Sequence, residues 1–189
     1  MCGLIGVVGT SILVSEDFIH SALDDINYRG PDARGVLVDK SAGVALGHVR
    51  LAIQDLSENA NQPFTIDGVT IVFNGEIYNF LDLKAELEAL SYRFKTSSDT
   101  EVLLVSYLHW GIKFLDKIEG MYAFAIYDGN RNKMFLVRDR VGEKPLFYKH
   151  IEGESLVFGS ELKSIFDGKN EDLHINDESL DYLLATGAT

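Results

Sequence analysis

Short hydrophobic runs recur along the chain, and most of them have the length and composition of β-strands. The runs that predict strands are residues 4–8, 35–39, 44–49, 69–73, 121–127, 133–137, 146–150 and 156–158. Short turns at 40–43, 128–130 and 152–154 separate several of these runs, so we expect antiparallel hairpins.

Apolar residues at helical spacing predict helices between blocks of strands. The expected helices cover residues 18–26, 80–90, 100–110, 161–166 and 178–184. Ser15 and Asn79 stand where the N-caps of the first two helices belong. Strands such as 4–8 and 121–127 are apolar on both faces, which requires a layer on each side of them. Two packed antiparallel sheets with helices outside, an α+β fold, satisfy that requirement.

Composition and charge limit the function. The chain has 189 residues, 46% of them hydrophobic and 24% charged, as in one globular domain with a sizeable core. A formal net charge of −12 disfavours nucleic acid or an anionic membrane as a partner, because both need clustered Lys and Arg. The single cysteine excludes an intrachain disulfide. No apolar run reaches the ~20 residues that span a bilayer, and the first residues lack the basic start of a signal peptide, so we expect a cytoplasmic protein.

Cys2 is the first candidate for chemistry. A lone cysteine is most often a small buried hydrophobe, but removal of Met1 would place this thiol beside a free α-amino group. Such an amine titrates near ~7.7–8.0, so at neutral pH it can accept the thiol proton and later return it to a leaving group. The position therefore indicates an N-terminal nucleophile that carries its own base.

The dipeptide Asn74-Gly75 has two interpretations. Asn-Gly after a strand is the strongest short hairpin signal, and the dipeptide alone favours that interpretation. The alternative is an oxyanion hole, in which the Asn side-chain amide and the Gly N–H point at one oxygen.

Arg50 and Asp99 are candidate partners for opposite charges on a substrate. Arg50 follows an apolar run and is either an edge arginine that reaches water or a bidentate partner for a carboxylate. Asp99 lies inside a Ser98-x-x-Glu101 capping box, where it stabilises a helix N-terminus and can also bind an ammonium group. His48 is expected to be a structural residue.

The sequence contains no motif for a metal or a phosphate group. Its five histidines lack the spacing of metal ligands, and one cysteine cannot build a thiolate site. There is no Walker loop and no G-x-G-x-x-G. We therefore expect neither a metal nor a cofactor in this domain.

Taken together, the motifs resemble those of the class II glutamine amidotransferases, which are N-terminal-nucleophile hydrolases, and of their asparagine synthetase branch in particular. The resemblance begins at Cys2-Gly3 and runs to about residue 166. The other matching segments are 29–32 (Arg-Gly-Pro-Asp), 47–53 (Gly-His-Val-Arg-Leu-Ala-Ile), 74–79 (Asn-Gly-Glu-Ile-Tyr-Asn), 98–101 (Ser-Asp-Thr-Glu), 120–125 (Gly-Met-Tyr-Ala-Phe-Ala), 138–140 (Arg-Asp-Arg) and 144–146 (Lys-Pro-Leu). Residues 74–79 select the branch, because glucosamine-phosphate synthases and purine amidotransferases usually carry a His before Asn-Gly.

The resemblance implies the four-layer αββα sandwich of N-terminal-nucleophile hydrolases and the hydrolysis of L-glutamine. By this resemblance Cys2 attacks the glutamine side-chain amide, while Asn74 and the Gly75 N–H hold the oxyanion. Arg50 binds the α-carboxylate of glutamine, and Asp99 binds its α-amino group. The other residues expected to line the glutamine pocket are Leu51, Ile53, Gln54 and Glu76.

Two short segments depart from the family pattern. Many relatives have Arg-Arg-Leu-Ser-Ile where residues 49–53 read Val-Arg-Leu-Ala-Ile, and Gly-x-Gln-Pro where residues 60–63 read Ala-Asn-Gln-Pro. Neither change removes an expected catalytic group, but both bear on the pocket loop.

In asparagine synthetases an ATP-binding synthetase domain follows the glutaminase domain. We expect residues 1–189 to form the glutaminase domain, as an excised domain rather than a free-standing glutaminase, and residues 167–189 to begin the connection to an absent synthetase domain. ATP and Mg belong to that second domain, which uses ammonia to amidate aspartate. The expected partners are L-glutamine and the synthetase domain, and a homodimer is left open.

Three alternatives remain open from the sequence. The domain could serve a sugar-modifying or antibiotic-pathway synthetase, it could be a non-catalytic module of the same fold, or it could be an N-terminal-nucleophile peptidase. A peptidase would not need Arg50 and Asp99 to match a free amino acid.

Overall fold

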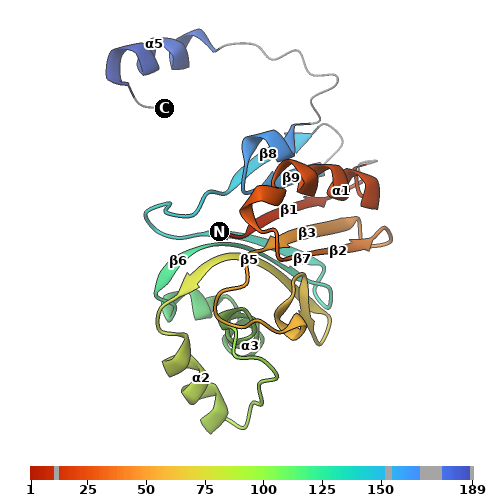
Figure 1. The fold of residues 1–189 in the computed structure, drawn as a ribbon, viewed down its shortest axis with the longest axis vertical. Coiled ribbons are helices and arrows are strands. Elements are labelled where there is room, and N and C mark those ends of the chain that lie inside the picture. Colours follow the sequence, from red (N-terminus) through yellow and green to blue (C-terminus); the bar gives the residue numbers. More distant parts are fainter. Residues whose placement is uncertain (11–12, 152–154, 167–175, 188–189) are drawn as a thin grey trace.

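Two antiparallel sheets lie face to face, and helices cover the outer side of each sheet (Figure 1). The computed structural model describes residues 1–10, 13–151, 155–166 and 176–187. The first sheet has the strand order β2 (Ala33–Asp39), β3 (Val44–Arg50), β1 (Gly3–Val8), β9 (Ser155–Gly159) and β8 (Phe147–Ile151). The second has the order β4 (Phe64–Ile66), β5 (Val69–Ile77), β6 (Gly120–Asp128) and β7 (Lys133–Arg138).

The helices are divided between the two sheets. Helices α1 (Glu16–Asp25) and α4 (Leu162–Ile165) pack on the first sheet, and α3 (Asp99–Trp110) packs on the second with α2 (Phe80–Ala89) beside it. Short 3₁₀ helices are η1 (Asn27–Arg29), η2 (Glu58–Ala60) and η3 (Gly111–Asp116). Helix α5 (Asp177–Thr186) follows residue 176, and its side chains are exposed.

Three apolar clusters fill the three spaces between these four layers. The cluster between the sheets consists of Leu4, Val44, Leu46, Val72, Ala125, Tyr127 and Phe158. A second cluster joins the first sheet to α1 and α4, and a third joins the second sheet to α2 and α3. Both faces of the central strands are therefore buried, as their all-apolar sequences predict.

The hairpin interpretation of Asn74-Gly75 is wrong. Strand β5 continues through both residues to Ile77, and they pair with Ala123 and Tyr122 of β6. A type I′ turn needs positive φ angles, and neither residue has one. The pairing with β6, a partner distant in sequence, has overridden the local turn preference.

The helix caps agree with the sequence in part. The Ser15 hydroxyl accepts a hydrogen bond from the Phe18 N–H over 3.3 Å, as predicted. Asn79 is the N-cap residue of α2, as predicted, but among the described residues its side chain makes no capping hydrogen bond. The side chain instead donates to the Lys117 carbonyl over 2.8 Å and accepts from the Glu119 N–H over 3.0 Å. Asn79 thus fastens the start of α2 to the segment before β6.

The capping box at the start of α3 is only half formed. The Ser98 hydroxyl accepts from the Thr100 N–H over 3.1 Å, but the Glu101 carboxylate accepts from the N–H groups of Lys95 and Thr96 instead of returning to Ser98. The predicted turn at 152–154 and residues 167–175 of the expected connection lie outside the described residues. None of the helices in the described ranges combines the length and the hydrophobicity needed to cross a bilayer.

His48 joins the two sheets. It is fully buried on β3, and its Nε2 lies 2.9 Å from the Phe73 carbonyl oxygen on β5, so Nε2 donates. Burial lowers the pKa of His48 to about 4, which keeps the ring neutral near pH 7. This is the structural role expected from the sequence.

We predict that His48→Gln makes the free energy of unfolding less sensitive to acid. The unfolded chain binds a proton at His48 below about pH 6.5, whereas the folded chain resists it down to about pH 4. The stability that neutral His48 contributes is present above pH 6.5 and is lost as the pH falls toward 4, by up to about 1.4 kcal/mol per pH unit. Urea unfolding of the parent and of His48→Gln from pH 7 to 4.5 measures the free energy of unfolding of each. The contributions of the other titrating groups cancel when one value is subtracted from the other. A difference that stays constant with pH would contradict the prediction.

Candidate active site

The Cys2 thiol lies at one end of the sandwich, just before β1. The Leu51 N–H points at Sγ over 3.4 Å, and Sγ lies 3.7 Å from the Leu51 carbonyl oxygen. Burial raises the pKa of the thiol, so the thiolate needs a nearby base or positive charge to form near neutral pH.

Strand periodicity brings Asn74 to the same space as Cys2. Side chains two residues apart on a strand face the same way, and Leu4 and Val72 pack together between the sheets. Asn74 lies two residues after Val72 on β5, so its side chain faces the space between the sheets. Cys2 precedes β1 and lines the same cavity as Gly75, the residue after Asn74. Asn74 is 2% exposed, and its Nδ2 has no hydrogen-bond partner among the described residues. The amide is therefore a buried donor that a ligand can satisfy.

The Gly75 N–H points to the free edge of β5. Gly75 pairs with Tyr122, whose N–H donates to Asp139 Oδ2 over 3.2 Å and whose carbonyl accepts from the Asp139 N–H over 2.8 Å. Residue pairs of this kind in an antiparallel ladder direct their own N–H and C=O groups away from each other. A Cβ at residue 75 would lie 2.3 Å from the Met121 carbonyl oxygen, so this close pairing requires glycine.

Two neighbouring N–H groups on this edge are already bonded. The Phe73 N–H donates to Gln62 Oε1 over 2.6 Å, and the Ile77 N–H donates to Asp99 Oδ2 over 3.0 Å. The Gly75 N–H lies between them and has no partner in the described part of the chain. Gly75 thus offers a backbone donor beside the unpartnered Asn74 amide, as an oxyanion site requires.

Arg50 is held by the loop that follows it. It is 8% exposed; Nη1 donates to the Ser57 carbonyl and to Asn61 Oδ1 over 2.8 Å each, and Nη2 donates to the Asp55 carbonyl. The edge-arginine interpretation is therefore wrong. These bonds leave Nε and one Nη2 hydrogen, which are adjacent donors suited to one carboxylate.

Asp99 is a buried carboxylate at the first residue of α3. It is 6% exposed, and burial raises its pKa to about 6, with the nearby charge of Glu76 adding to the shift. Ser98 provides the cap of the same helix, so Asp99 stays available for a ligand while it also bonds the Ile77 N–H. Glu76 accepts a hydrogen bond from Gln54 Nε2.

A small cavity beside Cys2 unites most of the predicted site. It has a volume of about 50 Å³ and contains eight of the nine residues predicted from the sequence: Cys2, Arg50, Leu51, Ile53, Gln54, Gly75, Glu76 and Asp99. The ninth, Asn74, precedes Gly75 on β5 and is not among the residues that line the cavity. The cavity places a buried guanidinium and a buried carboxylate near one thiol.

Sequence reasoning missed several residues that shape this cavity. Asp55 accepts from the Ser57 N–H and the Ser97 N–H over 2.8 Å each, which ties the loop after β3 to the start of α3. Hydrogen bonds from Ser57 and Ser97 hold the pKa of Asp55 far below its usual value. Gln62 lies deeper, where its Nε2 donates to Thr100 Oγ1 over 3.3 Å. Their loop is polar and irregular in sequence, and nothing in it indicates these distant partners.

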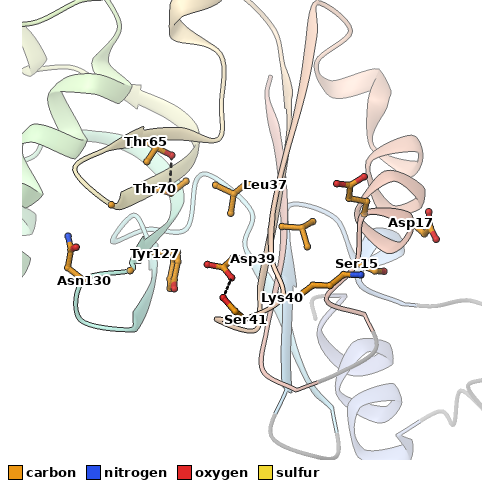
Figure 2. A pocket seen from close by; sticks show the side chains of 14 residues that line it. Ser15, Asp17, Leu37, Asp39, Lys40, Ser41, Thr65, Thr70, Tyr127 and Asn130 are labelled. Atoms are coloured by element: carbon orange, nitrogen blue, oxygen red, sulfur yellow. Dashed lines mark hydrogen bonds between the residues drawn. The ribbon is translucent and has the colours of Figure 1, made fainter.

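A larger groove lies elsewhere in the fold. It has a volume of about 1040 Å³ and lies between β2, the N-terminus of α1 and the turns of the second sheet (Figure 2). Its Asp39 side chain is occupied by Ser41 Oγ at 2.6 Å and the Ala42 N–H at 3.0 Å. The groove contains none of the predicted site residues and no thiol, so its size does not make it the catalytic centre. Across the described ranges, no group of three or more His, Cys, Asp or Glu side chains is placed to hold a metal ion.

Comparisons with known proteins converge on one kind of domain. Residues 1–189 match the family model described as a glutamine amidotransferase domain. Asparagine synthetase [glutamine-hydrolyzing] 2 of Bacillus subtilis (strain 168) is 45% identical over 172 residues, which are 88% of this chain and 22% of that protein. Amidase chry2 of Gibberella zeae is 40% identical over 148 residues, which are 77% of this chain and 22% of that protein. The chain thus spans about a fifth of these relatives.

A solved structure shows the same architecture. Glutamine phosphoribosylpyrophosphate (PRPP) amidotransferase from B. subtilis, complexed with ADP and GMP, matches with a TM-score of 0.71 and 25% identity, over 86% of this chain and 42% of that chain. The predicted fold of two antiparallel sheets between helices is therefore confirmed. With its full length covered by the family model, this chain belongs to the glutamine amidotransferase domain family.

Proposed function

We propose that this domain hydrolyses L-glutamine to L-glutamate and ammonia, with Cys2 as the nucleophile after removal of Met1. One observation carries the proposal: the cavity beside the Cys2 thiol is lined by a buried arginine and a buried aspartate of opposite charge. A free amino acid carries opposite charges on one carbon, so it matches both groups at once. Membership of the amidotransferase family supports glutamine as that amino acid.

The charged groups orient glutamine. The free Nε and Nη2 donors of Arg50 take the α-carboxylate, and Asp99 with Glu76 takes the α-ammonium group. Arg50 is held by backbone carbonyls and Asp99 by a backbone N–H, so both groups are in place before glutamine arrives. Such preorganisation lowers the entropy cost of reaching the reactive geometry.

The reaction proceeds through a thioester. The α-amine of mature Cys2 takes the thiol proton, and the thiolate adds to the carboxamide carbon of glutamine. Asn74 Nδ2 and the Gly75 N–H bind the oxyanion, the protonated amine returns its proton to the leaving nitrogen, and ammonia departs. Water then adds to the thioester carbon, giving glutamate and free Cys2.

We further propose that the ammonia supplies a C-terminal synthetase domain, which uses ATP and Mg to amidate aspartate. The relatives named asparagine synthetase are several times longer than this chain, which supports such a domain beyond residues 167–189. Amidase chry2, of similar identity, supports a second candidate, in which another acceptor takes the ammonia. Assaying the full-length gene product for asparagine formation from aspartate, ATP and glutamine separates the two.

We predict that Cys2→Ala abolishes ammonia release from glutamine without unfolding the protein, because one small side chain replaces another. Retention of Met1 has the same effect, since the base is then an amide. The measurements are ammonia release, the thermal midpoint and the intact mass. Active protein that still carries Met1 would overturn the mechanism, and cleavage of peptides in preference to glutamine would favour the peptidase alternative.

The KM for glutamine should rise as the pH falls below about 6, because Asp99 attracts the ammonium group only when it is ionised. The pKa of Asp99 is raised to about 6 in the free protein, and each pH unit below that value removes about nine-tenths of the ionised form. Asp99→Asn should have a high KM that is insensitive to this pH range. Asp82→Asn, the same substitution in the exposed first turn of α2, is the control and should match the parent. Equal hydrolysis of N-acetyl-glutamine and glutamine would refute the role of Asp99.

Replacement of Asn74 by Ala should lower kcat by about 10²–10³ and change KM only a few-fold, because the oxyanion forms only after the thiolate adds. Asn79→Ala is the matched control on the same segment. It removes two hydrogen bonds to backbone groups and should lower the thermal midpoint with kcat per active site intact. Active sites are counted by titration with a glutamine-like alkylating analogue. A normal kcat per titrated site in Asn74→Ala would exclude the oxyanion role.

A further inference from the structure

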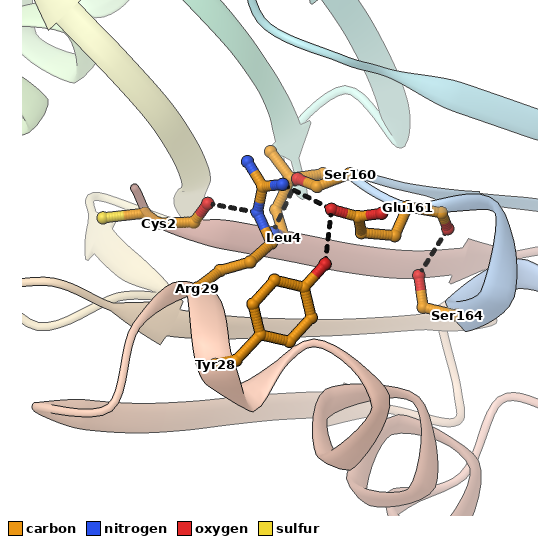
Figure 3. A network of polar contacts seen from close by, with 7 residues as sticks. All are labelled: Cys2, Leu4, Tyr28, Arg29, Ser160, Glu161 and Ser164. Carbon is orange, nitrogen blue, oxygen red and sulfur yellow. Dashed lines mark hydrogen bonds and ion pairs between the residues drawn. The ribbon is translucent and has the colours of Figure 1, made fainter.

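A polar network connects the backbone of Cys2 to the end of β9 (Figure 3). Arg29 Nε donates to the Cys2 carbonyl oxygen over 2.9 Å, and Arg29 Nη1 pairs with Glu161 Oε1 over 2.5 Å. The Tyr28 hydroxyl donates to the same Glu161 oxygen over 2.8 Å. Glu161 lies two residues after the end of β9 and is the N-cap residue of α4.

The place of the Arg29 guanidinium depends on Glu161. Arg29 is 7% exposed, and its Nη2 has no partner among the described residues. Among the described residues, Glu161 is the carboxylate that forms an ion pair with Arg29. A buried charge is strongly destabilised when its counter-charge is removed, so the guanidinium follows the carboxylate.

Cys2 needs this contact because it precedes the sheet. The first paired residue of β1 is Gly3, so no ladder hydrogen bond orients the Cys2 carbonyl. At Leu4 the strand is held by Ser160, whose N–H donates to the Leu4 carbonyl over 2.9 Å and whose hydroxyl accepts from the Leu4 N–H over 3.0 Å. The segment at the end of β9 thus holds Leu4 directly and Cys2 through Arg29.

We propose that Glu161 is a positioning residue of the glutamine-hydrolysing site: it holds Arg29 against the Cys2 carbonyl and so fixes the rotation of the nucleophile's backbone. The inference rests on the proposed function of Cys2. The amine, the thiol-bearing Cβ and the carbonyl share one Cα, so fixing the carbonyl sets the directions of the base and the nucleophile. A misplacement of about 1 Å costs on the order of 10² in rate.

Glu161 has the charge that this role requires. Burial raises the pKa of the carboxyl, but hydrogen bonds from Tyr28 and Arg29 outweigh that effect and hold the pKa below its usual value. The carboxylate is therefore ionised at neutral pH. Two positive groups face the network: Arg29 pairs with Glu161, and Lys163 Nζ lies over the Tyr28 ring, 4.5 Å from its centroid.

The test compares variants of this ion pair with a variant of a more exposed ion pair elsewhere. Glu161→Gln should lower kcat for glutamine by about 10² and leave KM within about threefold, because Arg50 and Asp99 still bind the substrate. Glu161→Asp, which keeps the charge, should recover part of the rate. Asp24→Asn is the control, since it breaks the 2.6 Å pair between Asp24 of α1 and Arg34 of β2, and no hydrogen bond or ion pair among the described residues joins either of them to Cys2. It should keep the parent kcat.

Cys2 alkylation gives a readout that does not depend on glutamine. In the mature protein, iodoacetamide should alkylate Cys2 of Glu161→Gln several-fold more slowly than in the parent at pH 7, with the midpoint of the pH profile moved to higher pH. The reason is that in the variant the α-amine is no longer placed to accept the proton of the Cys2 thiol. If the parent releases no ammonia, the glutaminase proposal fails, while the alkylation profiles still decide the role of Glu161.

Three results would overturn the positioning role. The first is a parent-like kcat and alkylation profile in Glu161→Gln. The second is an equal loss in Asp24→Asn. The third applies if Glu161→Gln does not fold, in which case Tyr28→Phe replaces it. This change removes one hydrogen bond to Glu161 from an exposed ring and should lower kcat several-fold. An unchanged kcat in Tyr28→Phe would refute the proposal.

Discussion

The packing of two sheets against each other organises the rest of the molecule. Each strand turns every second side chain toward the partner sheet, and along most of its length those side chains are apolar, as with Leu4 and Val72. At one end the same rows change character. Two residues before Leu4 stands Cys2, and two residues after Val72 stands Asn74. On β3, His48 stands two residues after the core residue Leu46. The candidate site is therefore an extension of the core pattern, and the packing that stabilises the fold also places the two groups that the proposed mechanism uses.

The electrostatics of the site depend on keeping opposite charges apart. Arg50 and Asp99 are both buried, yet no ion pair joins them in the part of the chain that the structure describes. Arg50 is satisfied by carbonyl oxygens and Asp99 by an N–H, which costs stability relative to a direct pair and leaves the pKa of Asp99 raised. Under the proposed function a zwitterionic ligand supplies both missing charges at once, so the arrangement that weakens the empty site would favour a free amino acid.

The sequence predicted the local elements well and the long-range contacts poorly. Strand runs, the Ser15 cap and the layered fold follow from periodicity and short-range chemistry, and the structure confirms them. Only the pairing with β6 shows that Asn74-Gly75 is part of a strand and not a turn. Likewise, only the contact with the segment before β6 shows what the Asn79 side chain binds. The supporting role of Asp55 has no sequence signal, because its partner Ser97 lies 42 residues away. Motif resemblance found the cavity residues that periodicity alone left ambiguous.

The short length of β4 has a consequence for association between chains. It pairs with β5 only as far as Ile71, so the second half of β5 has no neighbouring strand on this side within the described chain. An unpaired strand edge is where a strand from another molecule can add. Side chains from Gln62 and Asp99 occupy the N–H groups on either side of Gly75, which breaks the row of donors that a foreign strand would need. The residues that shape the cavity therefore also protect the domain against edge-to-edge aggregation, and variants that clear this edge would expose it to self-association.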